Sequence, residues 1–473
     1  MSVLVKIKNF KSIIETELEL NTGVNILIGS NGVGKTCILK SLMFIRDILN
    51  EGVIQAVAKN GGFKSVYHRN QSPKVVFSVT LDYGKRLFKR KKLPHELIWE
   101  FEIEQIKIKG DDIPIIKTEK IRIDALKGNV RNSVFEIDIK RYTTKNLVNV
   151  KYAKENISGK DLFDYFDSSL TKNVIYETFE QEIKKQENHY KKCVNSSILT
   201  ELLGIDRKIN FLHSMFTYLN EYSISPDTAR EEGEFLPYAE MLPNGKGLSN
   251  VIYALEKKNY NTIQSYKKRQ QNEFFYGRRR TILFGSNLFY RPYMRPSFNT
   301  RERYSTALNS INSEIAKAVK PINKITVVIN KTNGKKLLNF KTTDNNIFQP
   351  DEVSDGTIKW LAILVSLYIP FSDIYLLEEP ENFLHPWMQQ RLIEIMRNEA
   401  KKNNTISILT THSPVVLNKA NLDEVIIVKR DSNNSTVTNK ILNDKELKET
   451  LNKCDFGLGD LWVSGAIGAV PGE

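Results

Sequence analysis

Residues 29–36 have the side chains and glycines that hold a nucleotide phosphate. They read Gly-Ser-Asn-Gly-Val-Gly-Lys-Thr and fit the P-loop pattern G-x-x-x-x-G-K-[ST] at every fixed position. Glycines let backbone N–H groups turn toward an anion, the Lys reaches the β- and γ-phosphates, and the Thr hydroxyl binds Mg²⁺. We therefore predict ATP and Mg²⁺ as cofactors. The predicted ATP-binding residues are Asn31, Gly32, Val33, Gly34, Lys35 and Thr36, and Thr36 is also a predicted metal ligand.

Two adjacent carboxylates, Glu378 and Glu379, follow the apolar run 373–377. Leaving both at the end of a buried strand without a counter-charge is costly, and a bound Mg²⁺ with a water molecule gives a reason for them. We predict that Glu378 helps to hold the metal and that Glu379 orients and deprotonates the attacking water. A solvated strand end is the alternative.

His412 directly follows a second apolar run, 405–411. A His at the end of a strand that faces a γ-phosphate can hydrogen-bond to it and report its presence. An isolated His of this kind is more often structural. One strand–helix–strand unit separates His412 from the carboxylates, and this spacing favours the functional interpretation, so we predict His412 as a third catalytic residue.

These residues need a parallel sheet to bring them together. The run 23–28 predicts a buried strand that ends at the P-loop, and 37–45 has the apolar spacing of a helix. The runs 373–377 and 405–411 predict two further strands, joined by a crossover helix over 386–400.

The segment Ser354-Asp355-Gly356 completes a set of four motifs in one order along the chain. With the other three motifs, it resembles the signature motif of the ABC-type ATPase heads of the SMC/RecF/OLD group. The segments 5–12, 378–386 and 411–413 resemble that group's opening strand, its Walker B and D-loop, and its switch-histidine segment. The resemblance covers roughly residues 1–80 and 240–430. Alone, Ser-Asp-Gly would be read as a helix cap.

The resemblance implies an ATP site that is completed by a second copy of the chain. Ser354 and Gly356 would close on the γ-phosphate held by the partner's P-loop, so ATP would join at least two heads in a homo-oligomer. Gln71 is a weak candidate for the glutamine that contacts Mg²⁺ in such heads. An ABC transporter subunit is disfavoured, because the signature lacks the usual second glycine and glutamine.

The predicted fold is α/β: a P-loop ABC-type ATPase head with a mixed sheet and an antiparallel lobe, plus a helical insertion subdomain. Residues 1–150 form the N-terminal half, with alternating strands at 74–81 and 97–103. Residues 151–310 form the insertion, in which 198–222 has the pattern of one amphipathic helix. Residues 311–473 form the C-terminal half of the head. Its apolar tail, 456–468, is expected to pack on the core or on a neighbouring subunit.

Residues 256–304 are basic and aromatic. They contain 12 Lys or Arg, 3 Glu and no Asp, with 11 aromatic residues interleaved. This composition suits a nucleic-acid surface, an acidic protein partner, or a solvated helix whose rings belong to the core. The candidate contacts for nucleic acid or a partner are Arg278, Arg279, Arg280, Arg291 and Arg295.

The composition excludes some classes of protein. The chain has 473 residues, of which 41% are hydrophobic and 26% charged, and no run approaches 18 apolar residues, so we expect no membrane span. We expect no secretory signal, because the N-terminus begins directly with a predicted strand, and three widely spaced cysteines suit a reducing cytoplasm. We therefore expect a cytoplasmic protein.

Stand-alone OLD-like ATPases of this length resemble the ATPase components of bacterial anti-phage systems of the PARIS or Septu type. Only 61 residues follow His412, which we expect to leave no room for a second catalytic domain. The resemblance then implies a switch and scaffold that controls a separate effector, such as a Toprim-type nuclease, after a DNA or phage-protein trigger. A RecF/SMC-like DNA repair ATPase is the alternative.

Overall fold

The structure, a computed structural model, contains two compact units. Unit 1 comprises Met1–Thr22, Gly29–Thr217 and Ile427–Asn439, and unit 2 comprises Gly23–Ile28, Tyr218–Ile426 and Lys440–Glu473. Both contain sheets and helices, which confirms the predicted α/β class. More than half of the predicted insertion, 151–310, lies outside the described residues. The structure describes residues 1–82, 95–108, 110–127, 130–141, 146–152, 197–201, 207–236, 238–263, 300–369, 372–441 and 457–465.

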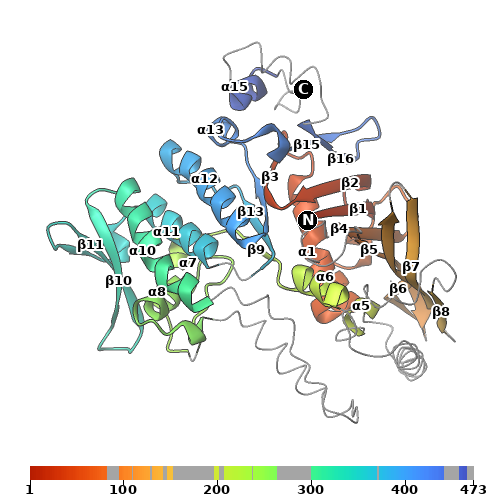
Figure 1. The fold of residues 1–473 in the computed structure, drawn as a ribbon, viewed down its shortest axis with the longest axis horizontal. Coiled ribbons are helices and arrows are strands. Elements are labelled where there is room, and N and C mark those ends of the chain that lie inside the picture. The colour runs from red at the N-terminus through yellow and green to blue at the C-terminus, as the bar shows by residue number, and fades with distance from the viewer. Residues whose placement is uncertain are drawn as a thin grey trace, which may run out of the picture. The chain divides into compact units, whose positions relative to one another are not determined.

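Unit 1 contains the predicted antiparallel lobe, a seven-stranded sheet in the order β2-β1-β4-β5-β6-β7-β8. Every neighbouring pair in it is antiparallel (Figure 1). The predicted strands at 74–81 and 97–103 are confirmed as parts of β4 and β5. The strands are β1 (Ser2–Phe10), β2 (Ile13–Asn21), β4 (Lys74–Asp82), β5 (His95–Ile108), β6 (Asp111–Lys127), β7 (Val130–Arg141) and β8 (Asn146–Tyr152).

The core of unit 1 is a row of packed aromatic rings between the sheet and α1 (Lys35–Glu51). Phe44 of α1 packs against Phe10 and Phe77, with ring centroids 5.4 and 6.0 Å apart. Phe77 stacks on Phe101 at 5.3 Å, and Phe101 packs on Trp99 at 4.5 Å. All five side chains are buried. This packing fixes α1, and therefore the loop that precedes it, on the sheet.

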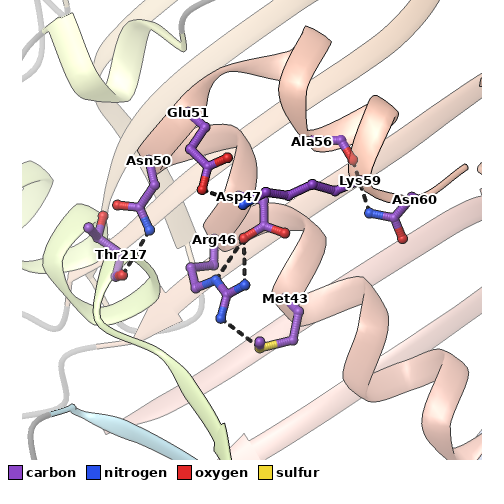
Figure 2. A network of polar contacts seen from close by, with 9 residues as sticks. All are labelled: Met43, Arg46, Asp47, Asn50, Glu51, Ala56, Lys59, Asn60 and Thr217. Atoms are coloured by element: carbon purple, nitrogen blue, oxygen red, sulfur yellow. Dashed lines mark hydrogen bonds and ion pairs between the residues drawn. The ribbon is translucent and has the colours of Figure 1, made fainter. Parts of the chain in front are cut away.

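Polar side chains in the last turns of α1 contact one another and the neighbouring helices of unit 1 (Figure 2). Arg46 pairs with Asp47 at 2.6 Å, and Glu51 pairs with Lys59 of α2. Asn50 donates to the backbone oxygen of Thr217, at the end of α6, at 3.1 Å. The other helices of this unit are α2 (Val53–Lys59), the 3₁₀ turn η1 (Phe63–Ser65), α5 (Ile198–Glu201) and α6 (Arg207–Thr217).

His213 of α6 is a buried titratable group that predicts a pH-dependent stability. Its ring nitrogens lie 3.2 and 3.4 Å from the hydroxyls of Thr217 and Thr200. Burial lowers the pKa of the His213 imidazole from 6.5 to about 3. The unfolded chain therefore takes up this proton near pH 6.5, whereas the folded chain does so only near pH 3. The contribution to stability is complete above pH 6.5 and is lost progressively below it.

We expect His213 to make folding at pH 5 less favourable than at pH 8 by about 2 kcal/mol. Urea unfolding at both pH values measures the difference. The variant His213→Gln, which has no titrating ring at this position, should lose that part of the pH dependence. An unchanged pH dependence in the variant would contradict the prediction.

Unit 2 is built on parallel strands in the order β3-β14-β13-β9. The strands are β3 (Gly23–Ile28), β9 (Asn220–Tyr222), β13 (Ile374–Glu378) and β14 (Ile406–Thr410). The crossover helix predicted at 386–400 is confirmed as α12 (Pro386–Asn403), which packs on β3 and β14. The predicted strands at 23–28, 373–377 and 405–411 are confirmed as β3, β13 and β14.

The prediction of a single helix over 198–222 is wrong. Helix α6 ends at Thr217, and Asn220–Tyr222 form β9, which pairs in parallel with β13. Tyr222 packs on Tyr375 of β13, with ring centroids 5.0 Å apart. Residues far away in the sequence supply both the edge of β13 and this ring contact. Together these two interactions override the helical periodicity of residues 198–222.

A helix layer and a small antiparallel sheet, β10-β11-β12, complete unit 2 (Figure 1). Helix α10 packs on β10 and on α11. Strands β15 and β16 are neighbours and lie mostly in unit 1. The elements are α7 (Pro226–Arg230), α8 (Leu248–Glu256), η2 (Tyr260–Thr262), α10 (Thr300–Ala318), β10 (Ile322–Ile329), β11 (Lys336–Thr342), β12 (Ile347–Phe348), η3 (Pro350–Glu352), α11 (Asp355–Tyr368), α13 (Pro414–Leu417), η4 (Leu422–Glu424), β15 (Val425–Arg430), β16 (Thr436–Lys440) and α15 (Leu458–Val463).

The apolar tail packs on unit 2 where the structure describes it, as predicted. Helix α15 contacts α13, and its Leu458, Leu461 and Trp462 side chains are buried. Trp462 lies beside His412, with ring centroids 6.3 Å apart. Among the described residues, no helix combines the length and the apolar character needed to cross a membrane.

Candidate active site

The phosphate-binding loop, residues 29–36, connects β3 to the N-terminus of α1. Lys35 is buried and its Nζ donates to the backbone oxygens of Gly29 and Ser30, at 2.8 and 3.1 Å. Gly34 precedes the helix in the left-handed region, with φ 110°, and no acidic residue occupies the first turn. The loop therefore presents a cation and the positive end of a 17-residue helix, which together favour an anion.

Two residues near the C-terminus of unit 1 brace this loop. The Thr436 hydroxyl donates to the backbone oxygen of Val33 at 2.7 Å and lies 2.9 Å from the Ser12 hydroxyl. A Cβ at Gly34 would overlap the Thr436 side chain. Arg430 donates to the backbone oxygen of Gly32 at 2.8 Å. These contacts span about 400 positions of sequence, and sequence analysis did not identify them.

The Thr436 brace predicts a modest effect on nucleotide affinity. Thr436→Val removes the bond to Val33 with little change of shape. We expect about 1 kcal/mol less stability and about fivefold weaker ATP binding, because the loop loses a fixed carbonyl. Thr438→Val is a matched control, since the Thr438 hydroxyl of the same strand bonds to the Glu17 backbone instead. Titration with a fluorescent ATP analogue measures both variants; equal affinity in the two would contradict the prediction.

The carboxylates lie at the carboxyl edge of the parallel sheet in unit 2. Strand β13 ends at Glu378, which is in register with Thr410 at the end of β14. Thr410 is in turn in register with Leu27 of β3. The residue after β3 is Gly29, the first of the phosphate-binding loop. The three strands thus end together at the edge where parallel α/β sheets bind ligands.

Glu379 is held in an unusual conformation at this edge. Its φ of 40° is in the left-handed region, which a non-glycine residue adopts only under constraint. Its N–H lies 3.1 Å from the Thr410 backbone oxygen and 3.2 Å from the Thr410 hydroxyl. The carboxylate lies 3.5 Å from Nε2 of His412. The structure therefore brings the predicted base beside the predicted switch histidine.

The carboxylates line a polar cavity of about 400 Å³ in unit 2, which we call the carboxylate pocket. Four acidic residues and one Lys carry its charge: Asp227, Asp355, Glu378, Glu379 and Lys359. The remaining lining residues are Ser223, Ile224, Ser225, Pro226, Asn382 and Phe383. The pocket is therefore mostly acidic, with a single cation in its lining.

The signature residues begin α11 and border this pocket through Asp355. Ser354 is the N-cap of α11, and its hydroxyl accepts from the Thr357 N–H at 3.3 Å. Its contact with a nucleotide held by a second copy stays a prediction. A Cβ at Gly356 would come 2.5 Å from the Phe383 backbone oxygen, so glycine is also required for packing. Arg230 of α7 pairs with Asp355 at 2.6 Å and fixes the start of the helix.

The structure does not test two further sets of predicted residues. Gln71 is exposed in the turn before β4 of unit 1, where its N–H bonds to the backbone oxygen of His68 at 3.1 Å. Its metal role stays a prediction. The predicted nucleic-acid or partner contacts all lie outside the described residues: Arg278, Arg279, Arg280, Arg291 and Arg295.

The sequence analysis also missed several residues that shape unit 2. Arg230 and Lys359 are single cations without a motif of their own. Glu381 and Gln389 bond to the segment after β14, 411–413, as described below. Only Glu381 gave a signal, because it is an acidic residue two positions after Glu379 in the run of carboxylates.

The two units have the predicted α/β fold, and residues 29–36 fit the P-loop pattern at every fixed position. Residues 215–418 match a family model described as an AAA domain, putative AbiEii toxin, type IV toxin–antitoxin system. This range includes β9, α11, both carboxylates and His412. No curated protein matches the chain.

Several solved structures of SMC head domains are similar to the chain. An SMC head bound to the C-winged helix domain of ScpA is 11% identical, with a TM-score of 0.46, and the match covers 92% of this chain and 96% of that one. The Smc head from Pyrococcus furiosus, bound to the C-terminal domain of ScpA, is 12% identical, with a TM-score of 0.42, covering 96% and 100%. The SMC head from Thermotoga maritima is 12% identical, with a TM-score of 0.37, covering 92% and 97%.

Proposed function

We propose that the chain binds and hydrolyses ATP and acts as a switch and scaffold that controls a separate effector protein in bacterial anti-phage defence. The shared carboxyl edge of β3, β13 and β14 is the observation that supports this proposal most strongly. The carboxylates and His412 lie at or shortly after the ends of two of these strands, and the phosphate-binding loop follows the third directly in the sequence.

Each residue then has a chemical role. Lys35 and the N-terminus of α1 bind the β- and γ-phosphates. Glu379 accepts a proton from the attacking water, and its fixed backbone conformation limits where its carboxylate can lie. His412 hydrogen-bonds to the γ-phosphate. Because its Nε2 lies 3.5 Å from the Glu379 carboxylate, binding of the γ-phosphate affects the position of the base.

The donor set suits Mg²⁺. The Thr36 hydroxyl and the Glu378 carboxylate are oxygen ligands, which this ion prefers, and nucleotide-dependent sites usually bind Mg²⁺ through one or two protein groups together with phosphates. The bound ion would neutralise charge on the phosphates. The chain's own residues supply the base, the loop and the histidine.

The effector part of the proposal rests on the matched family. The family is described as a putative toxin of a type IV toxin–antitoxin system, which is a pair of proteins that act together. The SMC heads are likewise bound to a partner, ScpA, in two solved structures. We extend this pattern to the present chain: ATP joins at least two copies through Ser354 and Gly356, and the assembly restrains an effector such as a Toprim-type nuclease in the cytoplasm.

Light scattering with and without ATP and Mg²⁺ tests the assembly, and phosphate release tests the activity. We expect ATP to raise the molar mass to at least that of two chains, and Lys35→Ala to stay at the nucleotide-free mass. Purification from the native host should recover the effector. A chain that releases no phosphate and keeps one mass in all conditions would contradict the proposal.

A DNA-repair ATPase of the RecF/SMC type is the second candidate, favoured by the excess of 12 Lys or Arg over 3 Glu in residues 256–304. It predicts DNA binding that weakens steeply with salt and that stimulates ATP turnover. Replacing Arg278, Arg279 and Arg280 by Ala would then reduce the stimulation. Turnover that is indifferent to DNA would favour the effector-control function.

A further inference from the structure

The loop that follows Glu379 is tied to the segment after β14 by a charged side chain. Oε1 of Glu381 accepts two hydrogen bonds, from the Thr411 hydroxyl at 2.8 Å and from the His412 N–H at 2.7 Å. We call residues 411–413 the switch segment. The same carboxylate oxygen therefore holds the backbone of His412, whose ring lies beside Glu379.

Gln389 of α12 forms a second tie to the switch segment. The Ser413 hydroxyl donates to Oε1 of Gln389 at 2.6 Å, and Nε2 of Gln389 donates to the Leu384 backbone oxygen at 2.9 Å. Both Glu381 and Leu384 belong to the loop that starts at Glu379. The switch segment and this loop are thus connected at two points, and a movement of one requires a movement of the other.

The other oxygen of the Glu381 carboxylate, Oε2, is buried and accepts no hydrogen bond from the described residues. Lys359 of α11 is also buried, with 5% of its surface exposed, and its Nζ makes no hydrogen bond within the described part of the chain. The ammonium lines the carboxylate pocket and lies 5.6 Å from the centre of the Phe383 ring.

Lys359 and the carboxylates interact electrostatically. Burial lowers the pKa of the Lys359 ammonium, while the charges of Glu381 and then Glu379 act to raise it. A buried charge is costly unless another charge compensates it. The two carboxylates therefore stabilise the charged form of Lys359, although no direct ion pair joins Lys359 to either of them among the described residues.

We propose that Glu381 is a positioning residue that clamps the switch segment and keeps His412 beside Glu379, and that the Lys359 ammonium in the carboxylate pocket is the cation that compensates the Glu381 carboxylate. This inference rests on the proposed function and deepens it. The bonds from the Thr411 hydroxyl and the His412 N–H to a carboxylate oxygen are charge-assisted and therefore stronger than bonds between neutral groups. Because Lys359 lies on α11, which begins at the signature residues, the clamp also links the signature helix to the hydrolytic residues of the same chain.

Steady-state ATP turnover of the full chain tests the clamp. We expect Glu381→Ala to lower kcat about 10- to 100-fold, while KM for ATP changes less than about twofold, because the clamp positions groups and does not hold nucleotide. Glu381→Gln keeps an acceptor oxygen, so it should recover part of the lost kcat. Glu394→Gln, at a half-buried partner of Arg391 on α12, is the matched control and should keep kcat. Equal kcat in Glu381→Ala and wild type would overturn the proposal.

A double-mutant cycle tests the charge partner. Lys359→Met leaves Glu381 buried without its cation, so it should also lower kcat. Once Glu381→Gln has removed the negative charge, the loss of Lys359 should cost less, and the double variant should be more active than the product of the single effects predicts. Independent, multiplicative effects would overturn the assignment of Lys359.

Hydrogen exchange separates the clamp from the proposed function. The His412 amide bonds to Glu381, so Glu381→Ala should raise the exchange rate in peptides that cover 409–417, whereas Glu394→Gln should not. If the wild-type chain releases no phosphate, the proposed function is wrong. The exchange rates alone then show whether Glu381 holds the switch segment. Unchanged exchange in Glu381→Ala would overturn it in either case.

Discussion

Replacing Glu379 by Gln is expected to lower the rate of ATP hydrolysis about 10²- to 10⁴-fold while ATP binding is retained. Gln has nearly the shape of Glu but cannot accept a proton from water. The backbone that sets the side chain in place is unaffected, because the N–H of residue 379 bonds to Thr410 whatever the side chain is. The variant should therefore bind ATP, assemble, and remain assembled.

Phosphate release and analogue titration measure the two properties separately. Lys35→Ala should weaken binding itself, because it removes the cation of the phosphate-binding loop. Light scattering should show the ATP-bound assembly of Glu379→Gln outlasting that of wild type. Glu394→Gln is the control for a generic loss of a carboxylate on unit 2. Hydrolysis by Glu379→Gln at the wild-type rate would show that another group is the base.

The elements around this site could be predicted from the sequence because their signals are local. The apolar run 23–28 before the glycines, and the carboxylates that end 373–377, each fix a strand boundary without reference to the rest of the chain. Strand β9 could not be predicted in this way. Its three residues are too few for a periodicity of two, and the pairing with β13 that defines it joins positions about 150 residues apart.

The contacts that adjust the site were also hidden from sequence analysis. Glu381 is visible as a carboxylate, but its partners in the switch segment lie 30 residues away and become apparent only in three dimensions. Lys359 occupies one position of a mostly apolar helix, where a solvated charge would be the ordinary expectation. Its burial follows from the packing of α11 beside the loop that contains Phe383.

A buried ion pair in the antiparallel sheet predicts the second large effect, on stability. Glu119 of β6 and Arg141 at the end of β7 have no exposed side-chain surface, and their charged groups are 2.8 Å apart. Glu119 also accepts from the Trp99 indole at 3.0 Å, from the Ser197 hydroxyl and from the Ile198 N–H at 2.9 Å. One carboxylate thus joins the sheet to the segment that starts α5.

We expect Glu119→Ala to reduce the free energy of unfolding by about 3–5 kcal/mol, because it removes the carboxylate that pairs with the buried Arg141 guanidinium. Thermal or urea unfolding, followed by Trp fluorescence, measures the loss, and Trp99 itself reports on the network. Glu17→Ala is the control, since it breaks the exposed pair with Lys6 and should cost less than about 1 kcal/mol. Equal losses in the two variants would contradict the prediction.

The double variant Glu119→Leu with Arg141→Met decides what the pair contributes. The desolvation penalty of two buried charges can be nearly as large as the energy of their attraction. In that case, replacing both by apolar side chains should restore much of the stability lost in Glu119→Ala. The donors of Trp99, Ser197 and Ile198 would still lack their acceptor, so recovery should be incomplete by about 1–3 kcal/mol. That remainder measures how strongly Glu119 holds α5 to the sheet, separately from its pairing with Arg141.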